Sequence, residues 1–343
     1  MGRKMKIGEA EVEIQSYGGK CIHFGKTRCT VFNKKKRLEQ KNLTKSKRCK
    51  GKDEDCKFFA GSSDFVPTYD ETYVLPRQES EILAHALGSG DNILITGPPG
   101  TGKSSLVKQL AAIFNWGVEQ YDCSEETTSA KILGQWIVSG KEMRWIDGCI
   151  THAMRHGYIL LEDEVDFMRP ELRGEVHGIM EVGGTLTLTA IHKETGEPFR
   201  EVVTKHPSFR WVSTSNTIGH GDDAFIYHGT QYINAASRDR YELIVDFKYK
   251  SVEEEIEILV IKTGIDKTMA TKMVQLANVC RQSETDMLFQ FSLRRLLAWA
   301  KYSQKMPVDL SAKLAVLNYC SVDDKHTVRS LMRTNMNLFN NEA

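Results

Sequence analysis

The sequence predicts an α/β protein in which helices cover a parallel sheet, followed by a smaller, wholly helical part. Between residues 92 and 247, short apolar runs of strand length alternate with segments of helical periodicity, which is typical of a parallel sheet with crossover helices. The first apolar run ends in a glycine-rich turn that opens a helical segment. After residue 247 the strand-like runs fade and helical periodicity alone continues.

The expected strands are short apolar runs, and the expected helices have apolar residues at helical spacing. In chain order, the strands are residues 92–96, 117–123, 158–162, 209–216 and 241–247. In chain order, the helices are residues 77–90, 104–114, 150–157, 170–183, 251–264, 267–282, 292–304 and 309–320.

Composition argues against a protein that spans a membrane. The 343 residues are 41% hydrophobic and 27% charged, and no uninterrupted apolar run approaches the length of a spanning helix. Residues 1–15 are charged and lack the apolar core of a signal peptide. We therefore expect no membrane partner and a cytoplasmic location.

Charge is distributed unevenly along the chain. The net charge is +1, but residues 1–60 hold 17 Lys/Arg and 7 Asp/Glu, a net of +10, so the rest of the chain carries −9. This asymmetry predicts a basic appendage on a mildly acidic body.

The segment GPPGTGKS, residues 97–104, fits the spacing G-x-x-x-x-G-K-[ST] in full and lies between a strand and a helix, as a phosphate-binding loop requires. Its glycines let backbone N–H groups turn inward around phosphate oxygens, and the helix N-terminus adds partial positive charge. We expect Lys103 to reach the β- and γ-phosphates and the Ser104 hydroxyl to ligate Mg²⁺. The expected nucleotide-binding residues are Gly97, Pro98, Pro99, Gly100, Thr101, Gly102, Lys103, Ser104, Ser105 and Asp163.

Four acidic residues crowd the end of the third expected strand: Glu162, Asp163, Glu164 and Asp166. A nucleotide-bound Mg²⁺ would justify them, because one carboxylate can hold the metal while a second acts as general base on the attacking water. Two registers are open, Glu162 with Asp163 or Asp163 with Glu164. Asp is shorter and suits a metal site at the strand end, whereas Glu reaches farther, which favours Asp163 for the metal and Glu164 for the water.

With these motifs, the chain resembles the AAA+ ATPases, within them the MoxR-type group, and most of all the CobS-type ATPase subunit of cobaltochelatase. The resemblance rests on DEVDFMRPE (163–171), on the stretch 214–245 with YHGTQ inside it, and on FSLRRLLAWA (291–300). It implies a P-loop AAA+ parallel-sheet core with a C-terminal helical lid, and it selects Asp163 and Glu164 as the acidic pair. It also implies ATP and Mg²⁺ as cofactors and ATP hydrolysis as the activity.

The resemblance implies further site residues, position by position. Asn216 looks like the polar sensor between the acidic pair and the γ-phosphate. Arg240 looks like the arginine finger that enters the neighbouring subunit's nucleotide site, with Arg238 as a rival. Arg294 looks like the lid sensor that reaches back to the phosphates, with Arg295 as a rival that a helix would direct about 100° away. A finger supplied in trans implies a homo-oligomer, and we expect a hexameric ring.

Two residues depart from the family's pattern. Glu162 stands where the family usually has an apolar residue, and a buried carboxylate at that position needs a cation or hydrogen bonds. Leu293 replaces the family's usual proline beside Arg294.

Two segments, residues 134–148 and 183–203, are expected to form β-hairpins, the first of which carries Trp136 and Trp145. Such hairpins characterise the MoxR-type group. They either contact a client or are ordinary surface hairpins with aromatic packing, and the sequence favours neither hairpin for the client.

The basic N-terminal unit, residues 1–62, lies outside the resemblance. The unit contains four cysteines, whose thiolates could form a tetrahedral zinc site, and His23 could replace one of them. A unit of this size needs such a cross-link to fold. The alternative is free thiols in a loosely ordered tail, because no C-x₂-C knuckle is present. The basic runs could also bind nucleic-acid phosphates. The four cysteines are Cys21, Cys29, Cys49 and Cys56.

We thus expect three parts: the N-terminal unit, an AAA+ nucleotide-binding domain over 63–248 and a helical lid domain over 249–343. The main functional prediction is an ATP-driven ring motor that remodels a partner, for which the family implies a metal chelatase or a protein with a von Willebrand-type domain. The alternative is a nucleic-acid motor or loader recruited through the basic unit. A third hypothesis is a nucleotide-dependent scaffold with negligible turnover.

Overall fold

The structure, a computed structural model, describes residues 3–7, 10–14, 63–139, 142–191, 198–217, 233–282 and 289–339. The described residues belong to two units. The first unit comprises the residues up to Tyr69 together with Arg77–Gly97 and Lys103–Asp246, and the second comprises Asp70–Pro76, Pro98–Gly102 and the residues from Phe247 onward.

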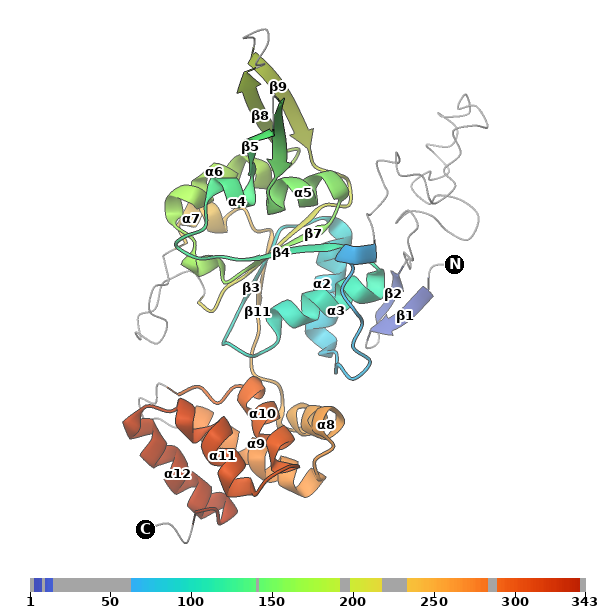
Figure 1. Ribbon diagram of the computed structural model, residues 1–343. Helices are drawn as coiled ribbons and strands as arrows, with labels where there is room; N and C mark the ends of the chain where they lie inside the picture. The colour runs from blue at the N-terminus through green and yellow to red at the C-terminus, as the bar shows by residue number, and fades with distance from the viewer. Residues whose placement is uncertain are drawn as a thin grey trace. The chain divides into compact units, whose positions relative to one another are not determined.

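A parallel sheet of five strands forms the centre of the first unit (Figure 1). Its central strands are apolar and buried, as in β3, where all four residues are buried, whereas the edge strands β4 and β11 are only partly buried. Because all pairings are parallel, the carboxyl ends of the strands meet at one edge of the sheet. In sheet order the strands are β11 (Leu243–Asp246), β3 (Ile93–Thr96), β10 (Arg210–Thr214), β7 (Ile159–Asp163) and β4 (Val118–Asp122).

The helices of the first unit contribute apolar faces to the core around this sheet. One buried cluster joins Met154 and Leu172, from two of the helices, with Leu160 of β7 and Trp211 of β10. The helices are α2 (Arg77–Ser89), α3 (Lys103–Phe114), α4 (Ser129–Ile132), α5 (Cys149–His156), α6 (Pro170–Met180) and α7 (Ala235–Arg238).

Two antiparallel hairpins stand apart from the central sheet, and Figure 1 shows β5 beside β8 and β9. The first pairs β5 (Gly134–Ser139) with β6 (Glu142–Asp147). The second pairs β8 (Thr185–Ile191) with β9 (Pro198–Thr204). A further antiparallel pair near the N-terminus consists of β1 (Arg3–Ile7) and β2 (Ala10–Ile14).

Helices make up the described part of the second unit from residue 247 onward. Phe291, Leu296 and Trp299 lie at the centre of its core and are almost fully buried. A reciprocal capping box between Ser251 and Glu254 fixes the start of the first helix. The helices are α8 (Val252–Thr263), α9 (Lys267–Gln282), α10 (Leu293–Ser303), α11 (Val308–Ala315) and α12 (Val322–Met336).

The predicted fold class is confirmed: a parallel sheet with helices around it is followed by a helical part. The expected helix over residues 309–320 is wrong in its second half. Helix α11 ends at Ala315, because Val316 adopts φ −123° and ψ −67° and breaks the hydrogen-bond ladder, and a short 3₁₀ turn follows at Leu317–Tyr319. None of the described helices has the length and apolar character to cross a bilayer.

Candidate functional site

Three polar segments meet at the carboxyl edge of the sheet because they follow neighbouring parallel strands. The phosphate-loop segment follows β3, the acidic segment ends β7, and Thr214 ends β10. On one side of β10, Thr214 lies opposite Ile95 of β3. On the other side of β10, Ser213 lies opposite Glu162 of β7. Strand order thus brings together residues that are more than 100 positions apart in the chain.

The phosphate-loop segment between β3 and α3 turns through backbone conformations that favour glycine. Gly97, Gly100 and Gly102 have φ angles of 134°, 76° and 93°, a region that side chains with a Cβ rarely adopt. Within the segment, Thr101 Oγ1 donates to the carbonyl of Pro98 at 2.9 Å. The spacing of the motif therefore follows from where the backbone must turn.

The side chain of Lys103, at the start of α3, is buried and extends back to Gly97, where the segment begins. Its Nζ donates to the carbonyl oxygen of Gly97 at 2.6 Å and to Asn216 Oδ1 at 2.9 Å. The structure thus brings Lys103 together with the expected sensor Asn216. By contrast, Ser105 is exposed on the first turn of α3.

Ser104 and Asp163 lie in direct contact, with Ser104 Oγ donating to Asp163 Oδ1 at 2.6 Å. Thr214 Oγ1 also donates to Asp163 Oδ1, and Gln120 Nε2 donates to Oδ2 at 3.2 Å. A hydroxyl and a carboxylate oxygen are the hard ligands that Mg²⁺ prefers, so this donor set fits the expected ion. Sequence reasoning missed Gln120 and Thr214; the polar residues that end the otherwise apolar segment 209–216 were a signal for the second.

Glu164 directly follows β7 in the left-handed region, with φ 58° and ψ 47°. Its N–H donates to Thr214 Oγ1 at 3.1 Å, which fixes the backbone at this turn. Burial raises the pKa of Glu164, and the carboxylates of Asp163 and Asp166 raise it further, while a hydrogen bond with the Asn216 side chain works in the opposite direction. A non-glycine residue at positive φ costs free energy and is common at functional sites.

Asp166 is fully buried and holds the segment that carries Asn216. Its Oδ2 accepts hydrogen bonds from the backbone N–H groups of Asn216 at 3.2 Å and Thr217 at 3.3 Å, and from Thr217 Oγ1 at 3.3 Å. The sequence showed this acid only as a member of a crowded cluster, because its partners lie 50 residues away.

Glu162 is 1% exposed, and hydrogen bonds supply what its burial requires. Trp211 Nε1 donates to Glu162 Oε2 at 2.8 Å, and Ser213 Oγ donates to the same oxygen at 2.5 Å. The Tyr121 hydroxyl donates to the other oxygen, Oε1. This carboxylate therefore lies inside the core, unlike the Ser104–Asp163 pair at the sheet edge.

Arg240, the expected finger, lies just beyond α7 and contacts its own subunit. Its Nε forms an ion pair with Glu181 Oε1 at 3.1 Å, and its Nη1 donates to the carbonyl of Ala236 at 2.6 Å. The rival, Arg238, is the last residue of α7 and is half-buried.

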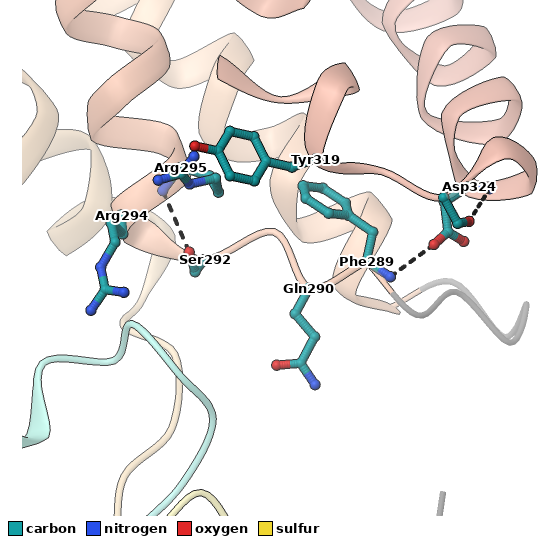
Figure 2. Close-up of a pocket in the computed structure, with 8 residues that line it drawn as sticks. Phe289, Gln290, Ser292, Arg294, Arg295, Tyr319 and Asp324 are labelled. Carbon is teal, nitrogen blue, oxygen red and sulfur yellow. Dashed lines mark hydrogen bonds between the residues drawn. The ribbon is translucent and has the colours of Figure 1, made fainter. Parts of the chain in front are cut away.

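The expected lid sensor lies in the second unit, beside a pocket of about 360 Å³ (Figure 2). Arg294 is exposed and extends away from Arg295 in Figure 2. Arg295 instead places its guanidinium 3.9 Å from the centre of the Tyr319 ring. The two arginines thus have different surroundings, and the choice of Arg294 as the lid sensor stays a prediction. The pocket is lined by Phe289, Gln290, Ser292, Arg294, Arg295, Tyr319, Ser321 and Asp324.

The cysteines expected to bind zinc, Cys21, Cys29, Cys49 and Cys56, lie outside the described residues. Within the described part of the chain, no group of three or more His, Cys, Asp or Glu side chains could hold a metal ion. A Mg²⁺ site built from one serine and one aspartate does not need such a group, because phosphate oxygens and water complete its coordination.

Comparison with known proteins agrees with this architecture. Residues 92–240 match the family described as "AAA domain (dynein-related subfamily)", and residues 255–337 match "CbbQ/NirQ/NorQ C-terminal". The chain is 28% identical to the aerobic cobaltochelatase subunit CobS of Sinorhizobium, over 75% of this chain and 78% of that protein. It is also 28% identical to the denitrification regulatory protein NirQ of Pseudomonas aeruginosa, over 78% of this chain and 96% of that protein.

A third relative, protein CbbQ of Hydrogenophilus thermoluteolus, is 28% identical over 61% of this chain and 72% of that protein. The first matched segment holds the phosphate loop and the acidic strand, and the second matches most of the helical unit. The two matched families, which follow one another along the chain, together with these relatives make the chain a member of the AAA+ ATPases of the MoxR-type group.

Proposed function

We propose that this chain hydrolyses ATP at the carboxyl edge of its central sheet. The observation that carries the proposal is the meeting of Lys103 and Ser104 with Asp163, Glu164 and Asn216. These residues come from three separate segments of the chain, and one hydrogen-bonded group contains both the donors that suit phosphate and the carboxylates that suit metal and water. Membership in a family that generally hydrolyses ATP supports the same activity.

Ser104 and Asp163 would hold Mg²⁺, and Lys103 would contact the β- and γ-phosphates. When bound, the ion neutralises charge on the phosphate oxygens. Gln120 and Thr214 donate to Asp163 and so keep its carboxylate oriented towards Ser104.

Glu164 is the proposed general base and Asn216 the residue that orients the attacking water. The raised pKa of Glu164 makes its carboxylate a stronger base. The Asn216 amide can donate and accept at once, and Asp166 fixes its backbone through the N–H of Asn216 itself.

Arg240 is proposed to act on the nucleotide of a neighbouring subunit, so the working form is a homo-oligomer, which we propose to be a hexameric ring. A planar, permanently charged guanidinium suits this role because it binds phosphate oxygens with two N–H groups at once. In its own chain Arg240 is paired with Glu181, which is more than half exposed. Because Glu181 is well solvated, this ion pair contributes little to stability, and Arg240 could exchange it for a phosphate.

The two hairpins, β5–β6 and β8–β9, are the proposed contact with a partner protein. Trp136 Nε1 of the first donates to the carbonyl of Thr189 in the second at 3.1 Å. Arg155 of α5 pairs with Asp147 of β6 at 3.0 Å and with Glu201 of β9 at 2.6 Å. Because these contacts join the hairpins, both would move together when the core changes its nucleotide.

Remodelling of a partner protein is therefore the proposed use of the ATP. The names of two relatives, a cobaltochelatase subunit and a regulatory protein, describe proteins that act with others. As the resemblance to the family implies, a partner with a von Willebrand-type domain is the first candidate.

The test uses Glu164→Gln, which keeps the shape of the side chain and removes the base. We expect ATP binding to persist while turnover falls by at least about 100-fold, and we expect the variant in ATP to retain a partner protein that mass spectrometry identifies. Glu171→Gln, an exposed acid on the first turn of α6, is the matched control and should behave as the unchanged protein. Full turnover of Glu164→Gln would contradict the proposed base, and stimulation by DNA that salt abolishes would favour the nucleic-acid motor instead.

A further inference from the structure

A buried chain of hydrogen bonds connects the segment that carries Arg240 to the strand that carries the acidic pair. Its two ends are charged: Arg173 of α6 is 3% exposed and Glu162 of β7 is 1% exposed. Between them lie two hydroxyl groups, those of Tyr241 and Ser213, which are buried as well. None of these four residues has a role in the chemistry proposed above.

The hydrogen bonds run in one direction, from the cation to the carboxylate. Arg173 Nη1 donates to the Tyr241 hydroxyl at 3.2 Å, Tyr241 donates to Ser213 Oγ at 2.8 Å, and Ser213 donates to Glu162 Oε2 at 2.5 Å. Each group in such a chain polarises the next and strengthens it. Burial raises the pKa of Tyr241 to about 12, so its hydroxyl remains a donor.

At the carboxylate end of this hydrogen-bonded series, Glu162 and Ser213 are each next in sequence to a residue of the proposed active site. Glu162 immediately precedes Asp163, and Ser213 immediately precedes Thr214. Thr214 in turn donates to Asp163 and accepts from the N–H of Glu164. A shift of β10 against β7 would therefore move both the hydrogen-bond chain and the catalytic carboxylates.

Tyr241, which lies between the two ends, is the member of this hydrogen-bonded series next to the finger. It immediately follows Arg240, whose carbonyl oxygen accepts from Asn92 Nδ2 at 2.9 Å. Arg173, the cationic end, also contacts the acidic segment directly, because its Nη2 donates to the carbonyl of Val165, the residue after Glu164, at 3.1 Å. The backbone at Arg240 is thus held from one side by Asn92 and from the next residue by the Tyr241 hydroxyl.

We propose that Tyr241 is a positioning residue that sets Arg240 relative to the acidic pair of its own subunit. The finger that serves one subunit's ATP is then held by the acidic strand of the subunit that donates it. This inference rests on the proposed function, in which Arg240 acts in trans.

Packing alone does not account for these four polar residues. Burying a charged pair costs desolvation energy, and apolar residues of similar size are often as stable or more stable in such places. A hydrogen-bonded chain differs from apolar packing in directional geometry, which is what a finger placed to within a fraction of an ångström needs.

The test uses mixed rings in which the finger and the active site are on different subunits. The donor carries Glu164→Gln, so its own site is inactive but its finger is intact, and the receiver carries Arg240→Ala. Adding Tyr241→Phe to the donor removes the hydroxyl group but keeps the aromatic side chain. We expect turnover of the mixture to fall about tenfold, with nucleotide affinity of both subunits and ring assembly unchanged.

Two controls separate positioning from general damage. Tyr241→Phe in the receiver, whose finger is already absent, should leave turnover unchanged. Tyr121→Phe in the donor removes a hydroxyl from the same carboxylate, Glu162, but on the side away from the finger, and should also leave turnover unchanged. If Tyr241→Phe does not fold, Ser213→Ala in the donor breaks the same chain and carries the same expectation.

The outcomes distinguish this inference from the function on which it rests. An inactive parent mixture would refute the finger in trans, and the inference with it. An active parent mixture that Tyr241→Phe in the donor leaves unchanged would overturn the inference alone. Equal losses from Tyr121→Phe, or from Tyr241→Phe placed in the receiver, would also overturn it, because they indicate a general structural effect.

Discussion

At the scale of single residues, the four crowded acids at the end of β7 are tolerated because each has different surroundings. Glu162 lies in the core among three donors, and Asp166 accepts from two backbone N–H groups and a hydroxyl. Asp163 faces Ser104 at the sheet edge, and Glu164 is exposed beside it. Distinct hydrogen-bond partners thus separate the buried structural carboxylates from the one proposed as the general base.

A substitution of Lys103 tests whether the segment between β3 and α3 binds nucleotide phosphates. Lys103→Ala removes the ammonium group that lies between Gly97 and Asn216, and we expect nucleotide affinity to fall by at least about 100-fold because a charge-assisted contact is lost. Titration with a fluorescent ATP analogue measures this. Lys108→Ala, one turn and a half further along the same helix, is the control and should bind normally; equal binding by both variants would contradict the assignment.

The lowered pKa of His177, on α6, predicts that the stability of the protein depends on pH. Burial lowers the pKa of His177 below its usual value of 6.5, and Arg240 and Arg173 lower it further. The unfolded chain therefore takes up this proton at a higher pH than the folded chain does. The contribution of His177 to stability is therefore fully present above pH 6.5 and is lost as the pH falls from 6.5 through the lowered folded-state pKa.

Thermal melts at pH 7.5 and pH 5.5 test this prediction. We expect the unchanged protein to lose more of its melting temperature on acidification than His177→Gln does, because glutamine can still hydrogen-bond the Ser237 hydroxyl, which lies 2.7 Å from His177 Nε2, but does not titrate. The same loss in both proteins would show that His177 has no part in the acid sensitivity.

At the scale of elements, a buried ion pair joins two helices of the second unit. Arg281 of α9 pairs with Glu255 of α8 at 2.9 Å, with side chains 7% and 1% exposed. Arg281 Nε also donates to the carbonyl of Phe291 at 2.8 Å, and its guanidinium lies 4.0 Å from the centre of the Tyr249 ring. Burial raises the pKa of Glu255, and Arg281 opposes that rise. The packing of α8 against α9 therefore depends on both charges of this ion pair.

Removing one partner of this pair should be costly. Glu255→Leu leaves Arg281 buried without its carboxylate, and we expect the free energy of unfolding to fall by about 3–5 kcal/mol. The double variant Glu255→Leu with Arg281→Met should recover much of that loss, because no unpaired charge remains. Urea denaturation of the full chain measures both, and a double variant no more stable than the single one would contradict this account.

At the scale of the whole molecule, the proposed activity needs more than one chain, because Arg240 would act on a neighbour. Arg240→Ala alone should be inactive although it binds ATP normally. Mixed with Glu164→Gln subunits, it should recover part of its turnover, since sites with an intact base then receive an intact finger. ATPase assays over a range of mixing ratios check this. No recovery at any ratio would argue against a finger in trans.

The sequence alone determined the local features of this protein: the phosphate loop, the buried strands, the helical periodicity and the family to which they belong. Those features are set by a few neighbouring residues, so a short stretch of sequence is sufficient to recognise them. The tertiary structure decided how Glu162 is satisfied, that Thr214 and Gln120 hold Asp163, and that Tyr241 connects Arg240 with the acidic strand. These contacts join residues 28 to 51 positions apart in the chain, and only the strand order of the sheet brings such residues within hydrogen-bond distance.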